Sequence, residues 1–176
     1  KVRRSMELKT IKIPENVTVN IKGKTVEVIG GKGRLVRDFS YAPVSIWSEE
    51  GLVKVKAAWP RKREVSLVGT VSAHIRNMIT GVTEGFTYKL KIVFSHFPIS
   101  VRVDGKKVKI DNFTGERSSR VAEIVGDAKV IVQSEDLIVQ GTNLEDVSQT
   151  AANIEQTTMA SKNDPRVFLD GIYIYE

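Results

Sequence analysis

Cysteine is absent from the 176-residue chain, which excludes disulfides, thiol catalysis and cysteine-based zinc or iron–sulfur sites. No apolar run approaches the ~18 residues that a membrane-spanning helix needs. Residues 1–5 are basic, but no apolar stretch follows them, so the sequence predicts no secretory signal peptide. These absences favour a cytoplasmic protein with no membrane partner.

Acidic residues are outnumbered: 21 Asp and Glu against 27 Lys and Arg give a net charge of +6 and a pI near 9.5. Residues 1–85 carry a net charge of +8, residues 86–120 carry +5 and residues 121–176 carry −7. A basic balance of this kind indicates a polyanionic partner, nucleic acid above all. The acidic last third of the chain should repel phosphate.

An internal repeat relates residues 13–33 to residues 97–115. Each copy has an alternating apolar pattern, a glycine turn and a second alternation, which predicts a β-hairpin. We align the copies with a two-residue gap placed just before Gly23-Lys24 in the first and Gly105-Lys106 in the second.

The two predicted hairpins should differ in their turns. Asp104-Gly105 is a favoured two-residue turn, because both positions tolerate a positive φ. The equivalent Lys22-Gly23 predicts a longer loop. A further hairpin is predicted in each half, within residues 44–56 and residues 129–139.

Each half then changes to a helical period. Apolar residues recur at helical spacing in residues 65–79 and again in residues 144–159. Thr142 or Asn143 can cap the second helix. A glycine and a strand follow each helix, the first strand beginning at Gly85-Phe86.

The order hairpin, hairpin, helix, strand predicts two tandem, duplicated α+β domains, each a mainly antiparallel β-sheet packed with one α-helix. We place the N-terminal repeat at residues 1–86 and the C-terminal repeat, the main RNA-binding candidate, at residues 87–176. No Gly/Ser-rich linker separates them, so close coupling is expected.

No motif supports catalysis, a metal or a cofactor. Gly23-Lys24-Thr25 lacks the earlier glycine and the strand-to-helix turn of a phosphate-binding loop. His74 and His96 have no second histidine at the spacing of a helical zinc site. An enzyme is therefore not predicted.

Basic side chains are the candidate site. They sit on or near glycine-rich loops and basic hairpins, where Lys and Arg pair with phosphates, and a histidine ring can stack on a base. Structured RNA fits better than duplex DNA, because neither predicted helix has a basic recognition face. The RNA-binding candidates are Lys32, Arg34 and Arg63 in the first half, and Lys89, Lys91, His96, Arg117 and Arg120 in the second.

Several segments carry a resemblance. They read HIRNMITGVTEGF at residues 74–86, SHFP at residues 95–98, NFTGE at residues 112–116 and RVFLDGIY at residues 166–173. Over residues 7–175 the chain resembles the universal large-subunit ribosomal protein L-six family, called L-nine in eukaryotic cytosolic ribosomes, and it is most similar to the archaeal branch. Two departures are Gly31 for the family's usual proline and Val121 for the second of two adjacent arginines.

The resemblance implies a duplicated α+β fold with no catalysis and no cofactor. It implies binding to large-subunit rRNA near the sarcin–ricin region and the stalk base, within the cytoplasmic ribosome. Neighbouring ribosomal proteins near the stalk base are implied partners, and translational GTPases would dock nearby.

A different class of function stays open from the residues alone. The second helix is acidic and rich in amides, which suits packing or contact with protein; it includes Gln149, Asn153, Glu155 and Gln156. The alternative is a non-ribosomal protein-interaction module with weak, non-specific RNA binding.

Overall fold

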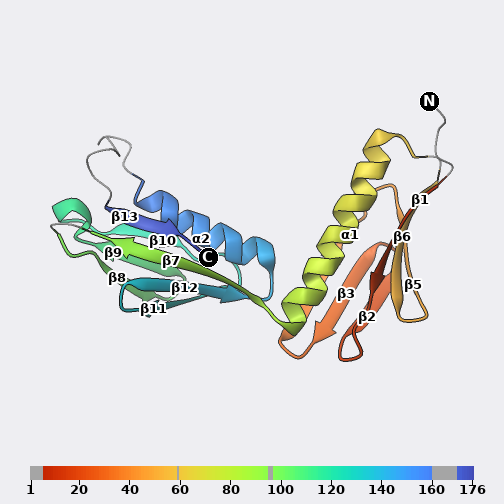
Figure 1. Ribbon diagram of the computed structural model, residues 1–176, viewed down its shortest axis with the longest axis horizontal. Coiled ribbons are helices and arrows are strands. Elements are labelled where there is room, and N and C mark those ends of the chain that lie inside the picture. The colour runs from red at the N-terminus through yellow and green to blue at the C-terminus, as the bar shows by residue number, and fades with distance from the viewer. Residues whose placement is uncertain (1–5, 59, 95–96, 160–169) are drawn as a thin grey trace. The chain divides into compact units, whose positions relative to one another are not determined.

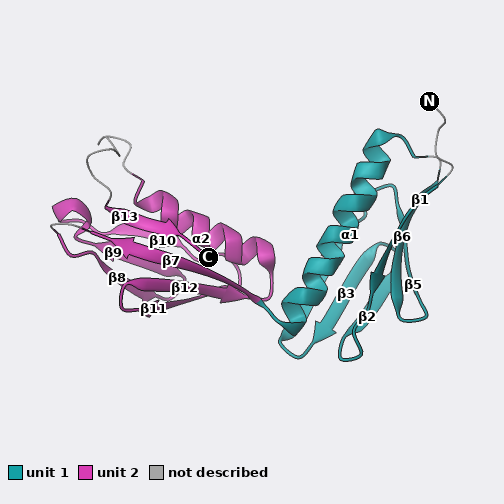
Figure 2. Cartoon of the chain, in the orientation of Figure 1, with its two compact units in different colours: residues 1–85 teal, residues 86–176 magenta. Residues whose placement is uncertain are grey.

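The computed structural model describes residues 6–58, 60–94, 97–159 and 170–176. The chain divides into two compact units, residues 1–85 and residues 86–176 (Figure 2). Each unit has its own hydrophobic core, built from antiparallel sheets and a helix. The predicted α+β fold class with duplicated domains is confirmed.

Unit 1 places a helix over two three-stranded sheets (Figure 1). The helix, α1, runs from Lys62 to Thr83, and its buried side chains include Val71 and Ile75. The sheet orders are β1-β6-β5 and β2-β3-β4. The strands are β1 (Met6–Lys12), β2 (Thr18–Lys22), β3 (Thr25–Gly30), β4 (Gly33–Asp38), β5 (Ser45–Glu49) and β6 (Leu52–Ala58).

Unit 2 repeats this plan and adds a strand. Its sheets have the orders β10-β9-β8 and β11-β12-β7-β13, and the helix α2 (Leu144–Thr157) contacts both. A short 3-10 turn, η1, covers Phe113–Gly115. The strands are β7 (Phe86–Val93), β8 (Ser100–Asp104), β9 (Lys107–Asp111), β10 (Arg120–Glu123), β11 (Lys129–Gln133), β12 (Asp136–Gly141) and β13 (Gly171–Ile174).

Both predicted helices form, with shifted ends. The first is longer than residues 65–79 on both sides, and the second ends at Thr157. Of the two proposed caps, Asn143 is used: its side chain accepts hydrogen bonds from the backbone of Glu145 at 3.0 Å and Asp146 at 3.4 Å. In the described part of the chain, no helix is long and apolar enough to cross a membrane.

The strand after the first helix was assigned to the wrong copy. Gly85 turns the chain with a φ of +76°, and the strand that follows is β7. This strand pairs with β12 and β13, so it belongs to unit 2. Each unit therefore begins with a strand; unit 1 ends with its helix, and unit 2 adds β13 after its helix. Strands β1, β4 and β10 were not predicted at all.

The predicted turns are also corrected. Lys22 pairs with Thr25 and Asp104 with Lys107, so both hairpins have two-residue turns, Gly23-Lys24 and Gly105-Lys106. The glycines have φ of +60° and +59°, which suits the first position of a tight hairpin turn. The prediction of a longer loop in the first copy is wrong. The two extra residues of that copy lie before β2 and not in the turn.

Candidate nucleic-acid interface

Among the described residues of unit 2, the side chains on one face of strand β7 in the four-stranded sheet are exposed or partly exposed. Its inner face, with Leu90 and Ile92 of β7, is buried in the core beneath α2 (Figure 1). Because side chains alternate along a strand, Lys89 and Lys91 lie on the opposite face, with 39% and 47% of their side chains exposed. We call this surface the outer sheet face.

Tyrosines adjoin these lysines on the outer sheet face. Tyr173 of β13 is directly opposite Lys91, and the backbone N–H of Tyr175 donates to the carbonyl of Lys89 at 3.0 Å. Tyr173 is 43% exposed and Tyr175 is 52% exposed. The face thus interleaves cations with aromatic rings, a combination suited to phosphates and bases.

Both lysines are in exposed ion pairs. The Nζ of Lys89 lies 3.0 Å from a carboxylate oxygen of Glu176, whose hydrogen bond raises the pKa of Lys89. The Nζ of Lys91 lies 3.5 Å from Asp136 and 3.8 Å from Glu135. Exposed pairs of this kind are screened by solvent and contribute little, so an RNA phosphate can compete for either lysine.

The two candidate arginines have different environments. Arg117 is exposed in the connection between β9 and β10. Arg120 donates from Nε and Nη2 to the Glu116 carboxylate at 3.0 and 2.7 Å and from Nη1 to the Thr157 carbonyl at 2.7 Å. Its guanidinium also lies 4.5 Å from the ring centroid of Phe113. Arg120 therefore fastens the connection to α2, and Arg117 is the more available phosphate ligand.

The Arg120–Glu116 pair shifts the pKa of both of its members. The hydrogen bond from Arg120 lowers the pKa of Glu116, and the same bond raises the pKa of Arg120. Both groups stay charged at neutral pH, and the pair holds the connection in shape.

The unit 1 candidates do not form one site. Lys32 is exposed, but its backbone N–H donates to the carbonyl of Val82 at 2.8 Å, so that amide is not aimed at a phosphate. Arg34 donates from Nε to Glu27 at 2.6 Å. Arg63 is exposed in the first turn of α1, whereas Val82 is in its last. At ~1.5 Å per residue these ends of the helix are about 30 Å apart.

His96 lies outside the described residues. Tyr173 and Tyr175 were missed as site residues from sequence, although their alternation with Ile172 and Ile174 was a signal that both rings share one strand face. Among the described residues, no group of three or more His, Asp or Glu could hold a metal ion.

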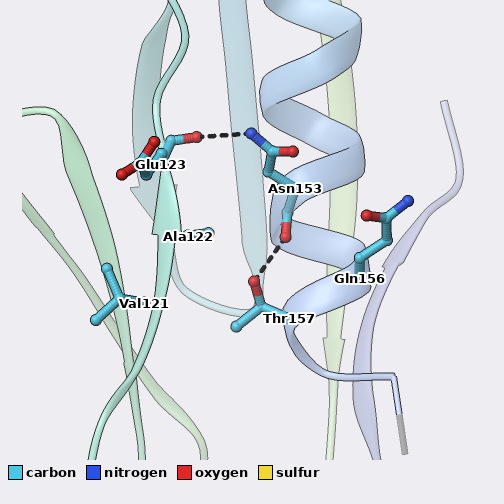
Figure 3. Close-up of a pocket in the computed structure, with 6 residues that line it drawn as sticks. All are labelled: Val121, Ala122, Glu123, Asn153, Gln156 and Thr157. Carbon is cyan, nitrogen blue, oxygen red and sulfur yellow. Dashed lines mark hydrogen bonds between the residues drawn. The ribbon is translucent and has the colours of Figure 1, made fainter. Parts of the chain in front are cut away.

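A second surface lies between the edge strand β10 and α2. Figure 3 shows Asn153 bridging this seam, with its Nδ2 donating to the carbonyl of Glu123 at 3.1 Å. Beside the bridge is an open cavity of about 360 Å³. The lining includes the side-chain amides of Asn153 and Gln156 and the carboxylate of Glu123, so the groove suits protein better than phosphate. Its lining is Val121, Ala122, Glu123, Asn153, Gln156 and Thr157.

Comparison with known proteins decides the family. The model of the family described as ribosomal protein L6 matches residues 13–85 and residues 97–171. The chain belongs to the ribosomal protein L6 family. The two matched segments are the two repeats, so the internal duplication is confirmed along with the resemblance.

Archaeal members are similar over nearly their whole length, and each is named large ribosomal subunit protein uL6. The relative from Ignicoccus hospitalis is 52% identical over 170 residues, covering 94% of this chain and 91% of its own. That from Desulfurococcus amylolyticus is 53% identical over 169 residues, covering 94% and 92%. That from Methanocella arvoryzae is 48% identical over 169 residues, covering 96% of each. Members of this family are structural constituents, which confirms that the chain is not an enzyme.

Proposed function

We propose that this protein is a structural constituent of the large subunit of the cytoplasmic ribosome and binds rRNA chiefly through the outer sheet face of unit 2. Family membership supports the place in the large subunit. The observation that best supports this RNA interface is that Lys89 and Lys91 lie beside two exposed tyrosines. Tyr173 is in β13, and Tyr175 follows it. No cofactor takes part.

The lysines act on the RNA backbone. Each neutralises a phosphate and releases bound counterions, which supplies affinity and orientation but little sequence information. Arg117 extends the same chemistry from the connection between β9 and β10. Arg120 contributes indirectly, because its bonds to Glu116 and Thr157 shape that connection.

The rRNA region is the finer part of the proposal. The family resemblance supports binding near the sarcin–ricin region and the stalk base, where translational GTPases dock. The protein would brace this rRNA, and its effect on those factors would be indirect. The groove between β10 and α2 is the surface best suited to a neighbouring ribosomal protein, since its lining includes the amides of Asn153 and Gln156.

The groove also favours the second candidate function, a protein-interaction module. That function predicts tight protein partners and only weak, sequence-blind RNA binding. The two candidates differ in how the purified chain binds RNA.

The test is binding to the 3′-terminal domain of large-subunit rRNA, with bulk tRNA as competitor, over a series of salt concentrations. We expect preference over tRNA and a linear fall of log K with log salt, by about 0.7–0.9 per neutralised phosphate. A shallow slope without preference would reject rRNA binding by the chain and favour the interaction module.

A further inference from the structure

Tyr173 is an aromatic residue at the surface of unit 2. It lies on the outer sheet face, opposite Lys91 and two residues after Gly171 on the same strand. Its neighbour Ile172 is fully buried on the inner face, which fixes the direction of both side chains. The ring is 43% exposed, so packing in the core does not explain an aromatic residue at this position.

Gly171 determines how the ring lies. A Cβ at Gly171 would be 3.2 Å from both Cζ and Oη of Tyr173 and 3.4 Å from Oγ1 of Thr158. The phenol therefore folds back along its own strand and covers the glycine backbone. The tip of the ring thus lies against Gly171, and 43% of the residue remains exposed.

An exposed aromatic ring whose tip lies against its own strand can stack on a base. Every nucleobase has a π face, so a fixed aromatic ring can bind an unpaired base whatever its identity. Bases inside a duplex are already stacked, so the ligand must be a looped, bulged or terminal nucleotide. Lys91, in the next strand, is within reach of the phosphate that adjoins such a base.

We propose that Tyr173 is a stacking platform for one unpaired base of the bound RNA, and that Gly171 is a positioning residue, because a residue without a Cβ leaves room for the tip of the phenol. This inference rests on the proposed function, because it names which nucleotide chemistry the outer sheet face takes. Tyr173 supplies affinity through the base, and Lys91 supplies it through the phosphate.

The two contributions respond differently to salt, which makes them separable. Full-length chain is titrated with the 3′-terminal-domain rRNA fragment over a salt series. Tyr173→Ala should weaken binding on the order of tenfold at every salt concentration and leave the slope of log K against log salt unchanged. Lys91→Ala should reduce that slope by about 0.7–0.9.

Three further variants control the result. Tyr173→Phe keeps the ring and should bind like the unchanged chain. Gly171→Ala should weaken binding in the same salt-independent way as Tyr173→Ala, with circular dichroism confirming the fold. Tyr41→Ala removes a 57% exposed tyrosine from unit 1 and should have no effect.

Full affinity of Tyr173→Ala, or equal loss in Tyr173→Phe and Tyr173→Ala, would overturn the stacking role while the proposed function stands. Failure of the unchanged chain to bind the fragment would overturn the proposed function and the inference with it.

Discussion

The first strands of the two units occupy equivalent places and present different surfaces. Ile11 of β1 is opposite Val53, as Leu90 of β7 is opposite Leu137, so Thr10 and Lys12 correspond to Lys89 and Lys91. Unit 1 has one lysine of this pair and unit 2 has both.

The neighbours of these strands differ more than the strands do. In the described part of unit 1, β1 is an edge strand, whereas β7 lies between β12 and β13. Strand β13 adds the exposed Tyr173, while β1 exposes Met6 and Leu8. One scaffold therefore supports two surfaces, and the added strand gives unit 2 its aromatic component.

The largest expected effect comes from damaging unit 1 and sparing unit 2. A Cβ at Gly30 would lie 2.7 Å from both Cγ2 and the carbonyl oxygen of Val82. Relieving this overlap requires a shift of the backbone at Val82, which is costly. Gly30→Ala should lower the free energy of unfolding by about 1–3 kcal/mol, measured by denaturant titration. RNA affinity should be retained, because unit 2 carries the interface.

Gly31→Ala is the matched control for that variant, since nothing lies within 4 Å of its added Cβ. A tenfold loss of RNA affinity in Gly30→Ala, under conditions where the chain is folded, would assign the interface to unit 1.

Substitutions at equivalent positions of β7 and β1 compare the two units directly. Lys89→Ala with Lys91→Ala should reduce the slope of log K against log salt by about 1.4–1.8, because two phosphate contacts are lost. The double variant Thr10→Ala with Lys12→Ala changes the equivalent positions of β1. It should reduce the slope by less than the loss of one phosphate contact does. Equal reductions in both double variants would show that the two faces do not differ in RNA binding.

Arg117 and Arg120, in and next to the connection between β9 and β10, should separate RNA binding from stability within unit 2. Arg120→Ala removes the bonds to Glu116 and Thr157 and should destabilise the fold by about 1–3 kcal/mol. Arg117→Ala should leave thermal unfolding unchanged and reduce the RNA salt slope by about one contact. The reverse assignment of stability and slope would refute the roles given to both residues.

The smallest effect concerns the start of α2. Burial, with help from Asp127 and Glu145, raises the pKa of Asp146. The ionised carboxylate therefore opposes folding above the raised pKa, and this cost disappears as the pH falls below the ordinary value of about 3.9.

Asp146→Asn should accordingly be more stable than the unchanged chain at pH 7, and the difference should shrink toward pH 3 in unfolding curves. A stabilisation that does not vary with pH would point to a cause other than the charge.

Local patterns predicted much of the fold. The helical spacing of Val71 and Ile75 located α1, and the Asn143 cap located the start of α2. The strand at Phe86 was placed in the wrong unit because its partners, β12 and β13, are distant in the sequence. Periodicity finds a strand, but only pairing tells which sheet it joins.

The candidate site was predicted less completely for a similar reason. Arg117 and Arg120 look alike in sequence, and only the packing shows that Arg120 is bound to Glu116. Lys89 and Lys91 were named from the sequence as basic residues of the second half, and the structure shows that both lie on one face of β7. Tyr173 became a candidate only when β13 was seen beside β7.

The central claim is that the outer sheet face of unit 2 contacts RNA. The most direct measurement is NMR of the ¹⁵N-labelled full chain, titrated with the 3′-terminal-domain rRNA fragment. The account predicts that signals of Lys89, Lys91 and Tyr173 shift or broaden first. Changes confined to Thr10 and Lys12, or to Val121 in the groove beside α2, would contradict it.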